Sequence, residues 1–324
     1  ADICTIGEAE MTIPKLMGAL ANNESLEGIK GIAYIKDGEF FHNGNPHLPT
    51  QVTKKEVGLP ALELFPLEHY FHSPKPHPFS QFDRNLPIVT GRGCPYACNF
   101  CYRVSAYRFR PVDEVMDEMG YMIDRYKVNS FYFEDDLFML SHQKMKDFCE
   151  GIINRGYKIK YNCSGRVNTV NREIAQLMKE SGCVAVYYGI ESGSQEILNN
   201  MSKKTNLEQI YEAIRLTREQ GIFCEYGFIY GEPNDNEQTM ADTVKLVKNI
   251  SSGEYRPQKI FGCVPFPGSG LYDWCKETGR IQDDQAFYDR YVCQDWSLDQ
   301  LPVNMTTMSD AKVNKVFKDA NDNL

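Results

Sequence analysis

The stretch Leu86–Cys101, LPIVTGRGCPYACNFC, begins as a short apolar run and ends in three closely spaced cysteines. Leu86–Thr90 has the length and the apolar side chains of a buried parallel strand. Cys94, Cys98 and Cys101 follow it directly, so their thiols can converge on one metal centre. The sequence therefore predicts a strand whose carboxyl end leads into a metal-binding loop.

Strand and helix patterns alternate from this stretch onward. The predicted strands are Leu86–Thr90, Ser130–Phe133, Lys158–Cys163, Val184–Tyr188, Phe223–Tyr230 and Lys259–Val264. The predicted helices lie near residues 112–126, 141–155, 171–181, 206–220 and 236–250. Strands joined by helices indicate an α/β fold with a parallel sheet, in which function gathers at the carboxyl ends of the strands. Periodicity alone leaves open whether the six units form a partial barrel or a flat sheet.

The flanking segments are less regular. Ile3–Ile6 predicts a strand, the helix after it carries Leu16, Met17 and Leu20 on one face, and Ile32–His42 predicts a hairpin. Residues 43–85 are rich in proline and histidine and predict a connecting segment. After about residue 276 we expect an acidic loop, with one late helix near Ser309–Ala320.

Composition excludes several classes of protein. The 324 residues include 35 lysines and arginines against 44 aspartates and glutamates, a net charge of −9, which argues against a nucleic-acid-binding protein with a broad basic face. No apolar run is long enough to cross a membrane, and the first residues do not resemble a signal peptide. Eight of the eleven cysteines are scattered, and we expect them to be buried small side chains of a cytoplasmic protein.

The three clustered cysteines favour an iron–sulfur cluster over zinc. Zinc usually takes four ligands from paired motifs, and only one Cys-x2-Cys pair is present here. Three thiolates on a four-iron cluster would leave one iron for a non-protein ligand. A non-catalytic iron–sulfur carrier or sensor and a structural zinc module remain the alternatives.

The spacing Cys94-x3-Cys98-x2-Cys101, with Phe100 before the last cysteine, resembles the signature of the radical S-adenosylmethionine (SAM) superfamily. The resemblance implies a partial (β/α)6 barrel of the TIM type and a 4Fe–4S cluster bound by the three cysteines. It implies that SAM chelates the fourth iron and is cleaved reductively to methionine and a 5′-deoxyadenosyl radical. That radical would abstract hydrogen from a small-molecule or natural-product substrate.

Further matches to this family follow the other predicted strands. Asp135 and Asp136 follow the second strand, Arg166 follows the third, and Gly189–Ser194 contains the Gly-Ile-Glu-Ser-Gly segment after the fourth. The resemblance implies that SAM is held by Phe100, Asp135, Asp136, Arg166, Glu191 and Ser192. Helix capping for the carboxylates and the serine, and a surface ion pair for the arginine, are the alternatives. Pro233–Asn236 departs from the Pro-Gly-Glu-Thr of many members. No catalytic residue is identified.

The amino-terminal segment resembles a narrower branch of the family. Ile6–Thr12, the hairpin and Leu59–Leu62 are similar to the end of a cobalamin-binding domain and its linker. The implied divisions are a domain remnant at 1–30, a hairpin and linker at 31–85, a radical SAM core at 86–275 and a carboxyl-terminal extension at 276–324. The branch implies methyl transfer to an unactivated carbon or, alternatively, cyclisation of a tetrapyrrole-like substrate. Cobalamin and an electron donor such as flavodoxin or ferredoxin would serve that chemistry.

Overall fold

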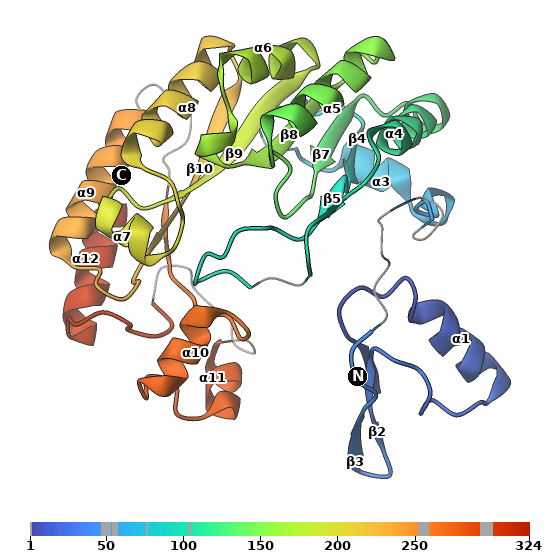
Figure 1. Ribbon diagram of the computed structural model, residues 1–324, viewed down its shortest axis with the longest axis horizontal. Coiled ribbons are helices and arrows are strands. Elements are labelled where there is room, and N and C mark those ends of the chain that lie inside the picture. The colour runs from blue at the N-terminus through green and yellow to red at the C-terminus, as the bar shows by residue number, and fades with distance from the viewer. Residues whose placement is uncertain are drawn as a thin grey trace.

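The computed structural model describes residues 2–46, 53, 58–75, 77–102, 105–251, 259–291 and 301–324. Within them a six-stranded parallel sheet forms the centre of the molecule (Figure 1). Its strands, in spatial order, are β4 (Asn85–Ile88), β7 (Ser130–Phe133), β8 (Lys160–Gly165), β9 (Cys183–Glu191), β10 (Phe223–Tyr230) and β11 (Ile260–Gly262). The strands follow one another across the sheet in chain order. Every neighbouring pair is parallel, so all six carboxyl ends meet at one rim. The α/β class and the partial (β/α)6 barrel are confirmed.

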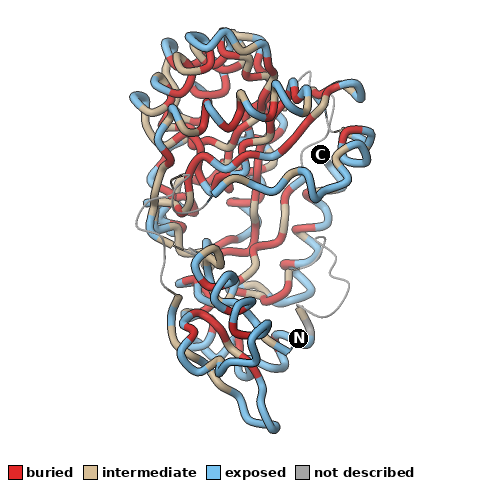
Figure 2. Tube along the Cα trace, turned by 90° about the vertical axis from the view of Figure 1, so that its right-hand side faces the viewer, coloured by how far each residue is buried: buried red, intermediate tan, exposed pale blue. Residues whose placement is uncertain are grey.

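Helices cover the outer face of this sheet (Figure 1). They are α4 (Val112–Tyr126), α5 (His142–Asn154), α6 (Arg172–Glu180), α8 (Leu207–Glu219), α9 (Glu237–Ile250) and α12 (Asp310–Asp322). The main core lies between the two layers, where Phe131, Tyr161, Tyr188 and Phe228 are fully buried. Buried positions accordingly concentrate along the strands and the inner sides of the helices (Figure 2).

Short-range chemistry fixes the helix boundaries. The side chains of Asn171, Asn206 and Asn236 accept hydrogen bonds from backbone amides in the first turns of α6, α8 and α9, which satisfies donors that have no partner inside the helix. Gly182 turns the chain from α6 into β9 with φ +103°, and a Cβ there would lie 2.2 Å from the carbonyl oxygen of Ile159. Only glycine fits that turn.

A small amino-terminal unit precedes the barrel. The strands β1 (Ile3–Thr5), β2 (Ile32–Lys36) and β3 (Glu39–His42) form an antiparallel sheet, and α1 (Ile13–Asn22) packs on it. The predicted strand, helix and hairpin are confirmed. Leu16 is buried in this unit, whereas Met17 and Leu20 are exposed.

The structure corrects the expectation for the irregular segments. The connecting segment 43–85 contains the 3-10 turn η1 (Leu62–Leu64) and α3 (Leu67–His72). The acidic loop after residue 276 contains α11 (Asp284–Tyr291), which follows α10 (Gly270–Glu277). These elements are short, so they give too few turns for a periodic pattern.

The scattered cysteines mostly follow the expectation. Six are buried, namely Cys149, Cys163, Cys183, Cys224, Cys263 and Cys275. Cys4 is exposed, which contradicts the prediction for that residue, and Cys293 lies outside the described residues. None of the helices in the described ranges has the length and apolar character that crossing a bilayer requires.

Candidate active site

The three clustered cysteines lie in a loop that starts from a short two-stranded stem. We define the stem as β5 (Gly91–Arg92) and β6 (Arg108–Phe109), and the cysteine loop as Gly93–Tyr102. The two stem strands pair antiparallel, with Arg92 opposite Arg108. Gly93 opens the loop with φ +73°, and a Cβ there would lie 2.5 Å from the carbonyl oxygen of Ser105. Only glycine at position 93 therefore lets the backbone of Ser105, which leads into β6, lie this close to the start of the loop.

Cys94, Cys98 and Cys101 line one cavity of about 720 Å³. Partial burial, and then the neighbouring Cys98 and Cys94, raise the pKa of the Cys101 thiol. No three His, Cys, Asp or Glu side chains of the described ranges are placed to hold a single metal ion. In an iron–sulfur cubane each thiolate binds its own iron, so the three sulfurs need not surround one point.

Several rim segments contact the cysteine loop through Asn99. Its backbone N–H donates to the carbonyl oxygen of Met201 at 3.1 Å, and its own carbonyl oxygen accepts from the N–H of Leu271 at 2.9 Å. Its side-chain amide donates to Oε2 of Glu232 at 3.2 Å. Glu232 follows β10, is fully buried, and has its pKa raised to about 7 by that burial. Neither residue is among the predicted site residues, because no local pattern links positions so far apart in the chain.

Asp135 and Asp136 follow β7 and face the start of the cysteine loop. Asp135 Oδ1 accepts from the backbone N–H groups of Thr90 and Gly91, at 2.6 and 3.1 Å, and Oδ2 accepts from the Thr90 hydroxyl. Burial raises the pKa of Asp135 to about 6. Asp136 is exposed, and its Oδ2 accepts from the N–H of Gly93 at 2.7 Å. Both carboxylates thus hold backbone beside the cysteines, and Asp136 retains the greater access to solvent.

Arg166 lies against the cysteine loop itself. Its guanidinium stacks 3.7 Å from the centre of the Tyr96 ring, and Nη1 lies 3.7 Å from Sγ of Cys98. Nη2 donates to the carbonyl oxygen of Lys203, and Nε is buried with no partner among the described atoms. The side chain is therefore buried, which argues against the surface ion pair considered for it.

Glu191 and Ser192 end β9 in different surroundings. A register shift between β9 and β10 puts Glu191 at φ +72°, and its Oε1 accepts from Nζ of Lys203 at 2.6 Å. Ser192 is buried against α9, where its hydroxyl lies 3.2 Å from that of Thr243. The Lys203 ammonium also lies 5.9 Å from the centre of the Phe100 ring, so two of the predicted residues, Glu191 and Phe100, lie beside one cation that was not predicted.

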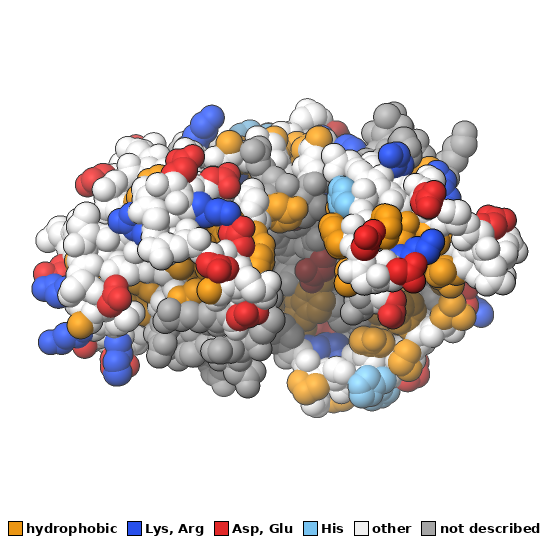
Figure 3. Space-filling model, turned by 90° about the horizontal axis from the view of Figure 1, so that it is seen from below, with side chains coloured by type: hydrophobic (Ala, Val, Ile, Leu, Met, Phe, Trp, Pro, Cys, Tyr) orange, Lys and Arg blue, Asp and Glu red, His pale blue; other side chains and the backbone are white. Residues whose placement is uncertain are grey.

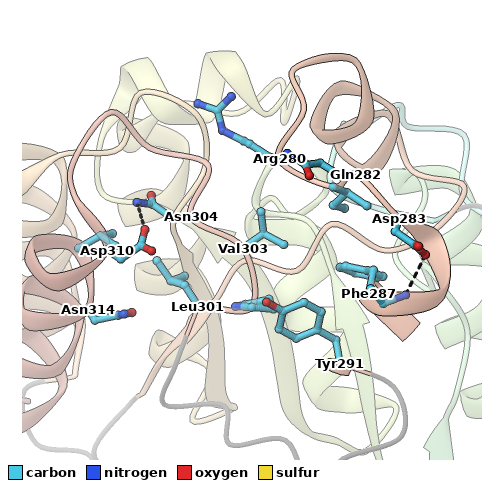
Figure 4. Close-up of a pocket in the computed structure, with 14 residues that line it drawn as sticks. Arg280, Gln282, Asp283, Phe287, Tyr291, Leu301, Val303, Asn304, Asp310 and Asn314 are labelled. Atoms are coloured by element: carbon cyan, nitrogen blue, oxygen red, sulfur yellow. Dashed lines mark hydrogen bonds between the residues drawn. The ribbon is translucent and has the colours of Figure 1, made fainter. Parts of the chain in front are cut away.

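The surface has a hollow, and it has a cavity apart from the cysteine loop. From below, the surface is hollowed between its two sides, and acidic side chains are visible inside the hollow (Figure 3). A second cavity of about 560 Å³ lies between α11 and α12 (Figure 4). It is lined by residues such as Arg280, Phe287 and Asn304 and by none of the predicted site residues. Cys94, Cys98 and Cys101 line the cysteine cavity instead. The six predicted SAM-binding residues, Phe100, Asp135, Asp136, Arg166, Glu191 and Ser192, are not among its lining residues.

The residues around that cavity suit an iron–sulfur cluster with a charged ligand. Three thiols supply the soft donors that iron–sulfur clusters take. Lys203 and Arg166 place positive charge beside the cysteine loop, while Asp136 and Glu191 offer carboxylate oxygens at the same rim. Gly268 and Gly270 line the cavity, and Nε of Arg166 is a buried donor that has no partner among the described atoms.

Comparison with known proteins gives consistent results. The profile of the radical SAM superfamily matches residues 88–247. An uncharacterised methyltransferase of Pyrococcus horikoshii is 30% identical over 277 residues, which cover 84% of this chain and 58% of that protein. An anaerobic magnesium-protoporphyrin IX monomethyl ester cyclase of Cereibacter sphaeroides is 28% identical over 302 residues, 90% of this chain and 46% of the cyclase.

A solved structure supports the same fold. The radical SAM methyltransferase TsrM from Kitasatospora setae, with cobalamin and a [4Fe–4S] cluster bound, matches with a TM-score of 0.67 at 17% identity, over 86% of this chain and 54% of that one. The chain thus spans about half the length of the curated relatives it matches. The matched residues include the cysteine loop and the four strands β7 to β10, and the chain belongs to the radical SAM superfamily.

Proposed function

We propose that this chain forms the catalytic core of a radical SAM enzyme, in which Cys94, Cys98 and Cys101 hold a 4Fe–4S cluster and SAM binds its fourth iron. The observation that carries the proposal is the single cavity shared by the three thiols, at the rim where charged residues from β7, β8 and β9 meet. When bound, the cluster supplies the electron that cleaves SAM to methionine and a 5′-deoxyadenosyl radical, which abstracts hydrogen from the substrate.

The chain's own residues then bind and orient SAM. Asp136 is exposed at the rim, so its carboxylate can accept from the ammonium of the methionine moiety while it holds Gly93. Arg166 has an unpaired Nε for the methionine carboxylate. Glu191, already oriented by Lys203, offers its second oxygen to a ribose hydroxyl. Phe100 lies beside the Lys203 ammonium, and Ser192, the residue after Glu191, is anchored by its contact with Thr243 of α9.

Methyl transfer to an unactivated carbon is the reaction we favour, because the Pyrococcus relative and the TsrM structure are both named as methyltransferases. Oxidative cyclisation is the second candidate, since the Cereibacter cyclase aligns with 90% of this chain. Cobalamin does not fit the described amino-terminal unit by itself. One helix, one strand and a hairpin do not enclose a corrinoid, so no step is assigned to it.

Anaerobic reconstitution with iron and sulfide tests the proposal. A brown protein that cleaves SAM under dithionite supports the enzyme. A brown protein without cleavage indicates an electron carrier, and a colourless protein that retains zinc indicates a structural zinc module. Cys4→Ala is the matched control, because it removes an exposed thiol that is not part of the cysteine loop.

Labelled SAM distinguishes the two reactions. With SAM carrying a ¹³C-methyl group, transfer of the label into a porphyrin or other candidate substrate supports methyl transfer. A substrate that loses hydrogen and closes a ring without taking up the label supports the cyclase.

A further inference from the structure

Two arginines face each other at the base of the cysteine loop. Arg92 on β5 and Arg108 on β6 are direct partners in the antiparallel register. Residues in such positions project their side chains to the same side of the pair, and like charges placed there destabilise it. The stem has one further residue pair, Gly91 with Phe109, so it has little pairing energy to oppose this repulsion.

Glu8, from the amino-terminal unit, lies between the two guanidiniums. Its Oε2 accepts from Nη1 of Arg92 at 2.7 Å, and its Oε1 accepts from Nη2 of Arg108. The Glu8 side chain is 8% exposed, against 21% for Arg92 and 14% for Arg108. Although burial opposes it, hydrogen bonding to Arg108 and Arg92 lowers the pKa of Glu8 below its ordinary value. One carboxylate therefore bridges both cations in a place where water screens their repulsion poorly.

Glu10 provides an internal comparison in the same segment. Its Oε1 accepts from Nη2 of Arg92, whereas Arg108 donates to Glu8. Removal of its charge leaves Glu8 in place between the arginines. Substituting Glu10 therefore removes one ion pair with Arg92, whereas substituting Glu8 removes the bridge between Arg92 and Arg108.

We propose that Glu8 is a positioning residue for the cluster site, because it holds the stem closed and so keeps the three thiols on one cavity. The role in catalysis rests on the proposed function, whereas the closed stem is a property of the chain before any cluster is added. The amino-terminal unit, 84 residues away in sequence from Arg92, would then control how firmly the cysteine loop is held.

Hydrogen exchange in the 324-residue chain, before reconstitution, tests this directly. The readout is the exchange of Gly93 and Asn99, whose N–H groups donate to Asp136 and Met201. We expect Glu8→Gln to raise exchange in the cysteine loop about tenfold or more and Glu10→Gln to change it much less, because only the first leaves the facing arginines unbridged. Equal exchange in the two variants overturns the proposal.

A double variant covers the case in which Glu8→Gln does not fold. In an Arg108→Gln background Arg92 no longer faces a second positive charge, so Glu8→Gln should add little further exchange in the loop. A further tenfold rise in the double variant contradicts the bridging role and indicates ordinary packing.

Iron incorporation then links the stem to the site. After reconstitution, Glu8→Gln should lose iron to a chelator several-fold faster than Glu10→Gln does. If the wild-type chain takes up no iron, the proposed function fails while the exchange results still decide the role of Glu8. If iron is retained equally in both variants, the positioning role fails while the proposed function stands.

Discussion

The ammonium of Lys203 lies 2.6 Å from Oε1 of Glu191, and both side chains are almost fully buried at the barrel rim. The carbonyl oxygen of Lys203 accepts from Arg166, which in turn contacts Cys98. This buried ion pair links β9 to the cysteine loop through Arg166. We therefore expect a substitution of either partner to alter the position of the loop that carries Cys98.

Lys203→Met should destabilise the fold strongly. It leaves the Glu191 carboxylate buried without its cation, at a cost of about 3 kcal/mol or more in the free energy of unfolding. Urea denaturation of the cluster-free chain measures this. The double variant Lys203→Met/Glu191→Gln should recover part of the loss, because no charge then remains unpaired. If the loss of unfolding free energy in the double variant equals the sum of the losses in the two single variants, the two residues act independently.

Glu232 should make the stability of the cluster-free chain fall as pH rises. Burial raises its pKa from 4.5 to about 7, so the folded state keeps a proton that the unfolded state has released. The stabilisation is fully present below pH 4.5 and is lost as pH rises through 7, up to about 3 kcal/mol. Glu232→Gln should therefore gain stability relative to wild type between pH 5 and pH 8, measured by urea midpoints. The exposed Glu277→Gln serves as the control and should follow wild type at both pH values.

Cys98→Ala should abolish cluster assembly and leave the fold largely intact. The residue lies in a loop outside the strand core, so its loss removes a ligand without opening a cavity in that core. Iron and sulfide content measure cluster assembly, and far-ultraviolet circular dichroism measures whether the fold is retained. SAM cleavage that persists in the variant would refute the assignment of the cluster.

The two aspartates after β7 should differ in their effects. Asp136→Asn should weaken SAM binding about tenfold while the visible absorbance of the cluster persists, because a charge-assisted contact is lost. Asp135→Asn should mainly lower stability, by about 1–3 kcal/mol, since its oxygens accept from Thr90 and Gly91 in the fold. Anaerobic equilibrium dialysis with SAM and thermal unfolding separate the two. Unchanged SAM affinity in Asp136→Asn would reassign that carboxylate to holding Gly93 alone.

The sequence predicted the barrel well because its strands and helices carry local signals. β7 and β10 begin and end at the predicted residues, and α4 does as well, since each is a continuous apolar or amphipathic pattern. α3 and α11, with six and eight residues, are too short to show one. The domain divisions remain a prediction.

Residues of the candidate site could be named from the sequence where they belong to a local motif or directly follow a predicted strand. The spacing of Cys94, Cys98 and Cys101 is local, and so is the Asp135–Asp136 pair. The contact of Asn99 with Glu232 spans 133 residues, and the bridge from Glu8 to Arg108 spans 100. Such contacts form only when distant segments pack together, so no local pattern in a single sequence predicts them.

The strands of the barrel are synthesised in the same order in which they lie in the sheet. Domains begin to fold from their amino-terminal side during synthesis, so β4 and the cysteine loop leave the ribosome before β8 and β9 exist. Arg166 and Lys203, which later cover one side of the loop, are translated afterwards. The three thiols are therefore synthesised before Arg166 and Lys203, so the nascent chain carries them for a time without these two cationic neighbours.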